Sequence, residues 1–213
     1  MAFQTESPWL LPKRLVLGQD GYEFRKRFQG GSFGAVAVYQ NHRASNKKII
    51  IKMQRPGPRA DQKWQKAEWK QELHVLRQVQ HRNVVRLLGD SHYGSVRYMV
   101  MEYCDRKDLR KYTMEAAHDQ RQISDLEGLW FLAQIASALA FIHSRGIVHR
   151  DIKPGNIGLC SYPGNPDWMP IIRVFDFGIS GYTNSPCPGG TLDFMSPGEQ
   201  SGTVAADVSY FSC

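Results

Sequence analysis

The stretch His149-Arg150-Asp151-Ile152-Lys153-Pro154-Gly155-Asn156 constrains this chain more than any other. It holds a carboxylate, an amine two residues later and a carboxamide five residues after the carboxylate. Asp151 can accept a proton from a hydroxyl, Lys153 can neutralise negative charge, and Asn156 offers a neutral oxygen to a hard cation such as Mg²⁺. Twenty residues after Asn156 comes Asp176-Phe177-Gly178, a second carboxylate beside a glycine at which the backbone can bend. A polar turn after a helix would explain the first segment alone, but the two segments together predict a chemical site.

The two segments in this order resemble the catalytic loop and the metal-binding turn of the protein kinase family. The resemblance covers roughly residues 22–213, and Asp207-Val208 is similar to the start of that family's central C-lobe helix. It implies an α+β, two-lobe fold with a small β-rich N-lobe that carries one main helix and an incomplete, mainly helical C-lobe. The expected boundaries are a lead-in over residues 1–20, the N-lobe over 21–101, a hinge over 102–107 and a partial C-lobe over 108–213.

The resemblance implies a reaction and its cofactors. The γ-phosphoryl group of ATP would be transferred, with Mg²⁺, to a hydroxyl of a protein substrate. Asp151 would be the base and Lys153 the group that neutralises the phosphate, with Asn156 and Asp176 as the Mg²⁺ ligands. Lys153 and Gly190-Thr191 resemble the serine/threonine branch of the family rather than the tyrosine branch.

A glycine-rich turn, 29–36, follows an alternating apolar and polar stretch that predicts a strand. Glycines at the tip of a hairpin let backbone N–H groups approach phosphate oxygens, although such a turn alone is more often a simple hairpin. It resembles the family's glycine-rich loop, with Gly31, Gly34 and Val36 in register. Gln29 stands where the first glycine of that loop is usual.

The β-branched run over residues 47–53 contains Lys52, which in the resemblance holds the phosphates of the nucleotide, and Ile50, where alanine is usual. Residues 61–80 contain no Gly or Pro and predict a helix. Glu72 lies on an otherwise apolar face of this helix, and an acid in such a place needs a partner. We therefore expect an ion pair between Glu72 and Lys52; the alternative is an exposed side chain on the helix surface.

Residues 97–104 are an apolar strand that runs into a short polar connector, similar to the hinge between kinase lobes. In this resemblance the backbone at Glu102 and Cys104 would bond to adenine. Met101 would lie at the back of the pocket, and Asp108 would reach the ribose. Cys104 could equally be a small buried apolar residue.

Gly158 stands at the second position after Asn156, where the family usually has a bulky aliphatic floor to the adenine pocket. In the same resemblance, Val36 and the residue at position 50 form the opposite side of the adenine pocket, its ceiling. Ile50 makes this ceiling larger than the usual alanine does, and Gly158 makes the floor smaller. We expect the two departures to compensate, with Ile50 pointing into the cleft opposite Gly158. The alternative is drift in a pocket that no longer binds nucleotide.

Ser124-Asp125-Leu126-Glu127 has the spacing of a capping box. The helix it predicts, to about residue 144, is apolar almost all round and should be buried from several sides. Where further helices are missing, it should expose an apolar patch. Farther on, Thr183 and Ser185 are candidate phosphorylation sites, and Arg150 is the cation that would receive such a phosphate.

The net charge of +7 is uneven, because residues 1–80 hold 15 lysines and arginines against 6 acidic residues. These charges are scattered rather than gathered in a tract, so a solvated basic face is favoured and nucleic-acid binding is not. No uninterrupted apolar stretch has the length of a membrane span. The four cysteines are widely spaced, which favours neither zinc nor disulfides and indicates an intracellular location, cytoplasmic or nuclear.

A second function remains open, that of an inactive pseudokinase or a truncated kinase-like interaction module. Gln29, Ile50 and Gly198, which replaces the Glu that usually closes the activation segment, favour this alternative, as does the short C-lobe. The full set of residues that would perform the chemistry favours the enzyme.

Overall fold

The computed structural model describes residues 12–17, 19–28, 35–41, 47–54, 62–165, 167–183 and 207, with the backbone alone at 62–65. Contacts divide the chain into two compact units. One comprises Met1–Trp69 and Leu87–Tyr103, and the other comprises Lys70–Arg86 and Cys104–Cys213. The predicted lobe boundaries remain a prediction; the span predicted for the N-lobe is shared between these units.

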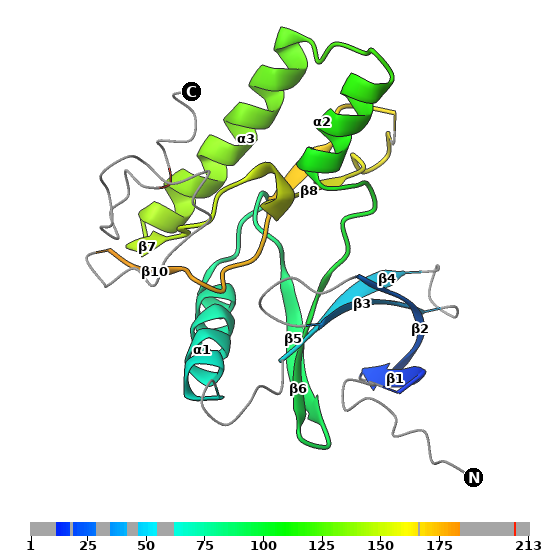
Figure 1. The fold of residues 1–213 in the computed structure, drawn as a ribbon, viewed down its shortest axis with the longest axis vertical. Coiled ribbons are helices and arrows are strands. Elements are labelled where there is room, and N and C mark those ends of the chain that lie inside the picture. The colour runs from blue at the N-terminus through cyan, green and yellow to red at the C-terminus, as the bar shows by residue number, and fades with distance from the viewer. Residues whose placement is uncertain are drawn as a thin grey trace. The chain divides into compact units, whose positions relative to one another are not determined.

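The first unit is built on an antiparallel sheet with the strand order β1-β2-β3-β4-β6-β5 (Figure 1). The alternating stretch predicted as a strand is confirmed in β2, and the β-branched run in β4. The lead-in expected at residues 1–20 contains a strand, β1, whose four residues are too few to show a period. The bounds are β1 Arg14–Leu17, β2 Asp20–Phe28, β3 Ala35–Gln40, β4 Lys48–Met53, β5 Leu87–Tyr93 and β6 Val96–Glu102.

One face of this sheet carries the core of the first unit. Successive side chains on a strand point to opposite faces, so every second residue of β4 joins the cluster. Tyr39 is fully buried there, and its hydroxyl donates to the carbonyl of Pro12 at 3.0 Å. Burial raises the pKa of Tyr39 to about 12. The buried members of the cluster are Leu15, Tyr22, Ala37, Tyr39, Ile49, Ile51, Met53, Tyr98 and Val100.

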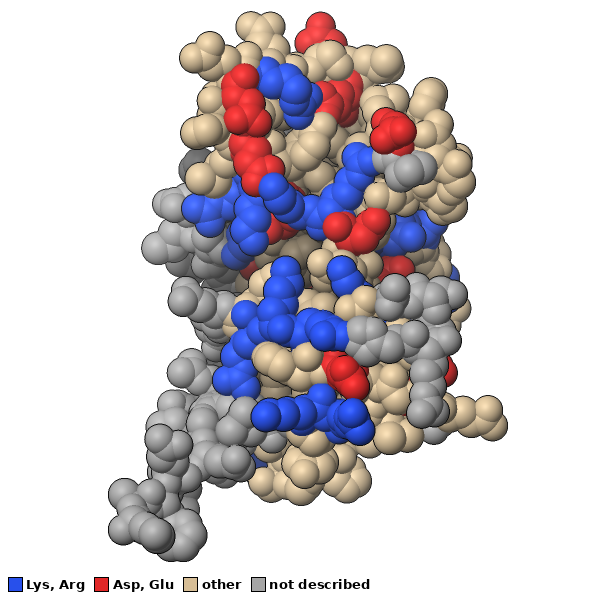
Figure 2. Space-filling model, turned by 90° about the vertical axis from the view of Figure 1, so that its right-hand side faces the viewer, with Lys and Arg blue, Asp and Glu red and all other residues tan. Residues whose placement is uncertain are grey.

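The basic excess of the chain is visible on these strands. In Figure 2, lysine and arginine side chains gather in the lower part of the view, and in the upper part they alternate with acidic ones. Arg25, Lys26 and Arg27 of β2 are exposed and successive, and Glu23 forms ion pairs with Arg14 and Arg25. Some of the exposed basic side chains therefore form ion pairs with a neighbouring acidic side chain, as expected for a solvated face.

The second unit is mainly helical. Helix α1, Gln62–Gln78, confirms the helix predicted over residues 61–80; it begins in the first unit and ends in the second. The predicted cap, Asp61, lies outside the described residues. Short antiparallel pairings complete the unit, and they include β7 with β10, β8 with β9, and isolated bridges between Asp108 and Gly158 and between Tyr162 and Asn165. The bounds are α2 Leu109–His118, α3 Asp125–His143, β7 Ile147–Val148, β8 Ile157–Cys160, β9 Ile171–Val174 and β10 Gly181–Tyr182, with a 3₁₀ turn at Pro154–Asn156.

Helix α3 begins as predicted at a cap, since the Ser124 side chain accepts from the N–H of Glu127 at 3.2 Å. Gln134 is the polar residue on its buried face, and its side chain is fully used. Its Oε1 accepts from the Asn83 side chain at 2.9 Å and from the Ile172 N–H at 3.2 Å. These bonds fix α3 against β9, the strand that leads to Asp176.

The expectation that α3 would be buried from several sides is wrong for the described structure. One face is buried, while Leu126 and Leu129 are 67% and 63% exposed and Leu132 is 45% exposed. The expected apolar patch is therefore present. By length and composition α3 could also cross a membrane, which the sequence did not lead us to expect. Because its other face is packed in the second unit, we interpret it as a core helix.

Candidate active site

His149 is the fully buried residue around which the loop after β7 is arranged. Its Nε2 donates to the carbonyl of Phe175 at 3.1 Å, and its Nδ1 accepts from the N–H of Asp151 at 3.2 Å. One nitrogen donates and the other accepts, which is the pattern of a neutral imidazole. The ring also packs against Phe177, with 4.6 Å between centroids. His149 thus ties the segment before Asp151 to the segment around Asp176.

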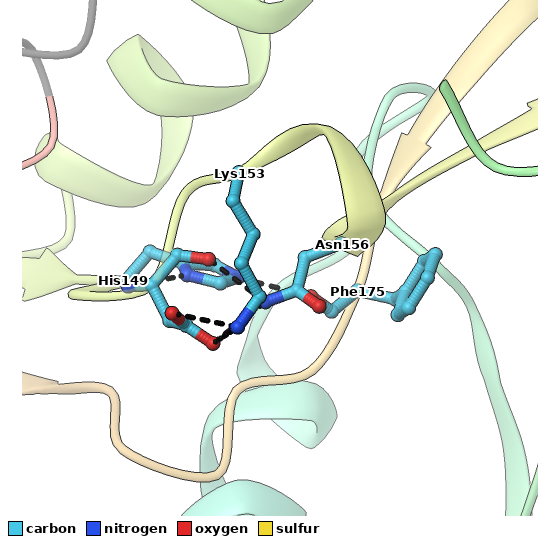
Figure 3. A network of polar contacts seen from close by, with 5 residues as sticks. His149, Lys153, Asn156 and Phe175 are labelled. Atoms are coloured by element: carbon cyan, nitrogen blue, oxygen red, sulfur yellow. Dashed lines mark hydrogen bonds and ion pairs between the residues drawn. The ribbon is translucent and has the colours of Figure 1, made fainter. Parts of the chain in front are cut away.

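The side chains of Asp151, Lys153 and Asn156 form one group of polar contacts, in which Figure 3 labels Lys153 and Asn156. The Lys153 ammonium lies 2.8 Å and 3.1 Å from the two carboxylate oxygens of Asp151. The Asn156 side-chain amide donates to Asp151 Oδ2 and to the Asp151 carbonyl, both at 2.8 Å. Asp151 is buried, so these bonds compensate the carboxylate for the water that it has lost.

A distant carboxylate holds this loop. Asp207 is fully buried, and its two oxygens accept from the successive N–H groups of His149 and Arg150, each at 2.7 Å. His143 Nε2 donates to the same carboxylate at 2.9 Å. Arg150 has φ +68°, a left-handed conformation that costs a non-glycine residue of the order of 1–3 kcal/mol. The bonds to Asp207 offset that cost, since this turn aims both N–H groups at one anion.

The predicted metal ligands come from adjacent strand ends. In the pairing of β8 with β9, the first residue of β8, Ile157, lies opposite the last residue of β9, Val174. Beyond this pair, the N–H of Phe175 donates to the Asn156 carbonyl at 3.0 Å. This places Asn156 beside the residue that precedes Asp176. Asp176 also has a left-handed backbone, with φ +69°. Within the described part of the chain, no cluster of three His, Cys, Asp or Glu residues could hold a metal alone.

The segment after Asp176 packs on Arg150. A Cβ built on Gly181 would lie 2.5 Å from Arg150 Nη1 and 2.7 Å from its Cζ, so the guanidinium occupies the place of a side chain there. Arg150 Nη2 donates to the Tyr182 carbonyl at 3.3 Å. The next residue after Tyr182, Thr183, donates its hydroxyl to the Gly146 carbonyl at 3.1 Å. Ser185 lies outside the described residues, and phosphorylation of either residue remains a prediction.

The structure also shows a link that the sequence did not suggest. The Tyr182 hydroxyl lies 3.0 Å from His74 Nε2 and accepts from the Gln78 amide at 3.3 Å. His74 and Gln78 stand one helical turn apart on α1. The segment after Asp176 is thereby fastened to the part of α1 that belongs to the second unit.

The expected smaller floor at Gly158 is corrected by the structure. A Cβ built on Gly158 would lie 2.6 Å from Cys104 Sγ, 3.1 Å from Cys104 Cβ and 3.4 Å from the Phe175 ring. The thiol of Cys104 therefore fills the place of the missing side chain, and packing rather than empty space explains the glycine. Ile50 belongs to the first unit, so its predicted position opposite Gly158 and the predicted compensation remain predictions.

Replacing Gly158 by Ala should lower the free energy of unfolding by about 1–3 kcal/mol, because the new methyl group overlaps Cys104 Sγ. The double variant Gly158→Ala/Cys104→Ala should recover most of the loss, since the overlap with Sγ is gone and only the 3.1 Å contact between Cβ atoms and the 3.4 Å contact with the Phe175 ring remain. Urea denaturation followed by circular dichroism measures both. Gly155→Ala is the matched control, because a Cβ there meets nothing within 4 Å. Equal losses of stability in the single and double variants would show that the Cys104 side chain does not limit the size of the residue at position 158.

The predicted nucleotide residues of the first unit lie on one face of the sheet. Val36 stands opposite Lys52 in the β3–β4 ladder, and Ile50 stands opposite Met101 in the β4–β6 ladder. Directly opposed residues share a face, and alternation puts Ile50 and Lys52 on the same side of β4. Glu102 ends β6. The predicted loop residues Gln29, Gly31 and Gly34 lie outside the described residues.

Three other predicted residues are placed in the second unit. Glu72 is buried, as an acid on the inner face of α1 should be, but Lys52 is in the other unit, so their ion pair remains a prediction. Asp108 caps α2 by accepting from the Lys111 N–H at 2.9 Å. This cap gives Asp108 a structural role besides the predicted contact to a ribose. Neither Cys104 nor Cys160 forms a disulfide, and the intracellular location remains a prediction.

Asp207 and His143 are the residues of the site that sequence reasoning missed. The resemblance relates Asp207 only to the start of a helix. A signal was present, because Val204-Ala205-Ala206 before it and Val208 after it leave this acid alone in an apolar run. Such an acid needs a buried partner. The apolar residues around Asp207 do not indicate which group is its partner, because that group lies 57 residues earlier in the chain, at Arg150.

Comparison with known proteins identifies a family and several related proteins. A family model described as the protein kinase domain matches residues 22–209. The human serine/threonine-protein kinase ULK1 is 37% identical over 124 residues, which are 57% of this chain and 11% of the relative. The putative mitogen-activated protein kinase 14C of Drosophila melanogaster is 34% identical over 83% of this chain and 45% of its own length. The serine/threonine-protein kinase Nek1 of Toxoplasma gondii is 32% identical over 98% of this chain and 14% of its own length.

This chain thus spans less than half the length of each of these relatives. The antiparallel sheet of the first unit, the helices of the second and the match over residues 22–209 agree in the fold they indicate, which is α+β and kinase-like. On this evidence the chain belongs to the protein kinase family.

Proposed function

We propose that this chain is an ATP-dependent serine/threonine kinase domain that transfers the γ-phosphoryl group of ATP to a hydroxyl of a protein substrate. The observation that carries the proposal is the buried carboxylate of Asp151, held by Lys153 and Asn156 on a loop that Asp207 anchors. The names of the serine/threonine kinase relatives support the branch, as do Lys153 and Gly190-Thr191.

Asp151 would accept the proton of the acceptor hydroxyl. Its carboxylate is fixed before a substrate arrives, because the amide of Asn156 and the ammonium of Lys153 hold it. A pre-positioned base contributes about 10²–10⁴-fold to a rate. Lys153 is partly exposed, so its ammonium could also approach the negative charge of the group being transferred.

The donor set at Asn156 and Asp176 fits Mg²⁺. The nitrogen of the Asn156 amide is used by Asp151, which leaves its oxygen as the atom for a cation. Mg²⁺ is usually held by one or two carboxylates together with substrate phosphates, which accords with the lack of a complete cage among the described residues. Bound Mg²⁺ would neutralise phosphate charge. Lys52, with Glu72, would hold the phosphates of ATP. Val36, Ile50, Met101 and the backbone at Glu102 and Cys104 would enclose adenine.

Incubation of the protein with γ-³²P-labelled ATP, Mg²⁺ and myelin basic protein tests the proposal. We expect labelled acceptor whose acid hydrolysate contains phosphoserine and phosphothreonine. Phosphotyrosine as the labelled product would contradict the branch. Binding of ATP without transfer would contradict the enzyme and support the alternative below.

The alternative is a catalytically inactive kinase-like interaction module. The exposed leucines of α3, Leu126, Leu129 and Leu132, favour it, because apolar patches of this kind commonly bind other proteins. The intact set of Asp151, Lys153 and Asn156 favours the enzyme.

A further inference from the structure

The second unit carries a group of basic side chains around the connection between α1 and β5. His81 and Arg82 belong to this connection, Arg173 belongs to β9, and Arg145 follows the C-terminal end of α3. All of these segments lie in the second unit. Arg82 and Arg145 are exposed, and His81 and Arg173 are partly exposed, so a ligand in solution can reach each of the four side chains.

Direct contacts bring these side chains together. The Arg173 guanidinium donates to the backbone carbonyl of Arg82. The His81 ring stacks on Phe141 of α3 with 4.8 Å between centroids, and the Arg145 guanidinium lies 3.7 Å from the centroid of the same Phe141 ring. Burial lowers the pKa of this imidazole, and the positive charges of Arg82, Arg173 and Arg145 lower it further. Three guanidinium groups are therefore close enough to one imidazole to affect its charge.

Two of these arginines lack the acidic partner that basic side chains of this unit have elsewhere. Arg121, for example, forms an ion pair with Glu127 at 3.0 Å. Arg82 and Arg145 form no ion pair with any residue that the structure describes. Like charges held close together repel one another, so this arrangement does not stabilise the fold by itself. A ligand with negative charge would remove the repulsion.

Neutral donors stand beside the arginines. His81 Nδ1 accepts from the N–H of Asn83 at 3.2 Å, so Nε2 of the neutral ring carries the proton and donates to Ser137 Oγ at 3.4 Å. The exposed Ser137 hydroxyl thus keeps its own proton, which it can donate to an anion. Ala133 and Ala140 flank Ser137 on the same face of α3 and are exposed. Their small side chains leave room for an extended segment beside this hydroxyl.

We propose that this basic cluster, formed by His81, Arg82, Ser137, Arg145 and Arg173, docks a phosphorylated segment of a partner protein. The phosphate of a phosphoserine or phosphothreonine lies between Arg82 and Arg173, with the Ser137 hydroxyl as a further donor. A guanidinium suits this group because it can donate two parallel hydrogen bonds to phosphate oxygens. A phosphate also carries more negative charge than one carboxylate and so balances several arginines. The cluster shares no residue with the candidate active site and is independent of the proposed kinase activity.

The probes are the peptide acetyl-Ala-Ala-phosphoserine-Ala-Ala-amide and its unphosphorylated form, titrated into ¹⁵N-labelled protein and followed by NMR. The phosphopeptide should shift the backbone amide signals of Arg82, Asn83 and Ser137 saturably, with or without ATP and Mg²⁺. The unphosphorylated peptide should leave them unchanged. Because a bound dianion opposes the positive charges around His81, the pKa of the His81 imidazole should be higher in the complex than in the free protein.

Single substitutions separate the cluster from the general positive charge of the chain. Arg82→Gln and Arg173→Gln should each weaken the phosphopeptide by about tenfold, an electrostatic change of ordinary size. Ser137→Ala should weaken it by about two- to tenfold, as expected for the loss of one hydrogen bond. Arg110→Gln is the matched control, because Arg110 is an exposed arginine of α2 in the same unit and its loss changes the net charge equally. The affinity of this variant should match that of the wild type.

Four outcomes would overturn the proposal. Equal weakening by Arg82→Gln and Arg110→Gln would show general attraction to a basic protein, and shifts that avoid the cluster would place the peptide elsewhere. Equal affinity for inorganic phosphate and for the phosphopeptide would show an adventitious ion only. Tighter binding to vesicles of phosphatidylcholine and phosphatidic acid, whose headgroup carries the same phosphate, would assign the cluster to a lipid surface. Arg82 is exposed, so Arg82→Gln decides the matter if Arg173→Gln does not fold.

Discussion

Asp151→Asn should reduce phosphoryl transfer by about 10²–10⁴-fold and leave the affinity for ATP nearly unchanged. The carboxamide has the size of the carboxylate and can still accept one bond from Lys153 or Asn156, but it cannot take up the proton of the acceptor hydroxyl. The side chain is buried and its partners are on its own loop, so the substitution acts on the chemical step rather than on the nucleotide. Steady-state transfer rates, together with calorimetric titration of ATP, measure the two effects separately.

Thermal unfolding of both proteins is the control, because a large loss of stability would explain inactivity without chemistry. Asp105→Asn is a matched variant: Asp105 is also held by hydrogen bonds, with Ser161 N–H at 2.8 Å, but it lies outside the loop. Transfer at equal rates by wild type and Asp151→Asn would contradict the assignment of Asp151 as the base. Absence of transfer by the wild type would favour the interaction module.

Asp207→Ala should be the most destabilising single change at the site. It removes the acceptor of two buried backbone N–H groups, and each unsatisfied group costs about 1–3 kcal/mol, so a loss of about 2–6 kcal/mol is expected. The left-handed turn at Arg150 would lose the contacts that offset its strain, and the loop that carries Asp151 would no longer be held. The free energy of unfolding from urea titration measures the loss.

Asp119→Ala provides the comparison. Asp119 is also an aspartate beside a histidine, but its contact with His118 is on the surface, where such a pair contributes about 0–1 kcal/mol. A second readout is the ¹H–¹⁵N spectrum, in which the amide signals of His149 and Arg150 should shift or broaden in Asp207→Ala. Stabilities and amide signals that match the wild type would show that Asp207 does not anchor the loop.

The sequence was sufficient for features that lie in one short segment. Asp151, Lys153 and Asn156 lie within six residues of one another, so the sequence could single them out together as one chemical site, and the structure shows that their side chains are in contact. The cap of α3 was predictable for the same reason, since Ser124 and Glu127 are three residues apart. Alternation and β-branched runs also predicted β2 and β4.

Contacts between distant segments could not be predicted in the same way. Nothing near Gly158 in the sequence indicates that Cys104 fills the space beside it, so the sequence alone suggests a smaller floor of the adenine pocket. Strand β1 was missed because four residues show no reliable period, and its place is fixed by pairing with β2. Burial on one side of α3 was also not predictable, because an apolar helix does not specify which of its faces find partners.

The anchor at Asp207 has a consequence for the order in which the site is completed. A ribosome makes residues 149–156 well before residue 207, so a nascent chain already holds Asp151, Lys153 and Asn156 while the acceptor for the His149 and Arg150 N–H groups does not yet exist. Closing a contact over 57 residues also carries a loop-closure cost that local contacts avoid. The arrangement of this loop would therefore be completed late in synthesis, after residue 207 has been added.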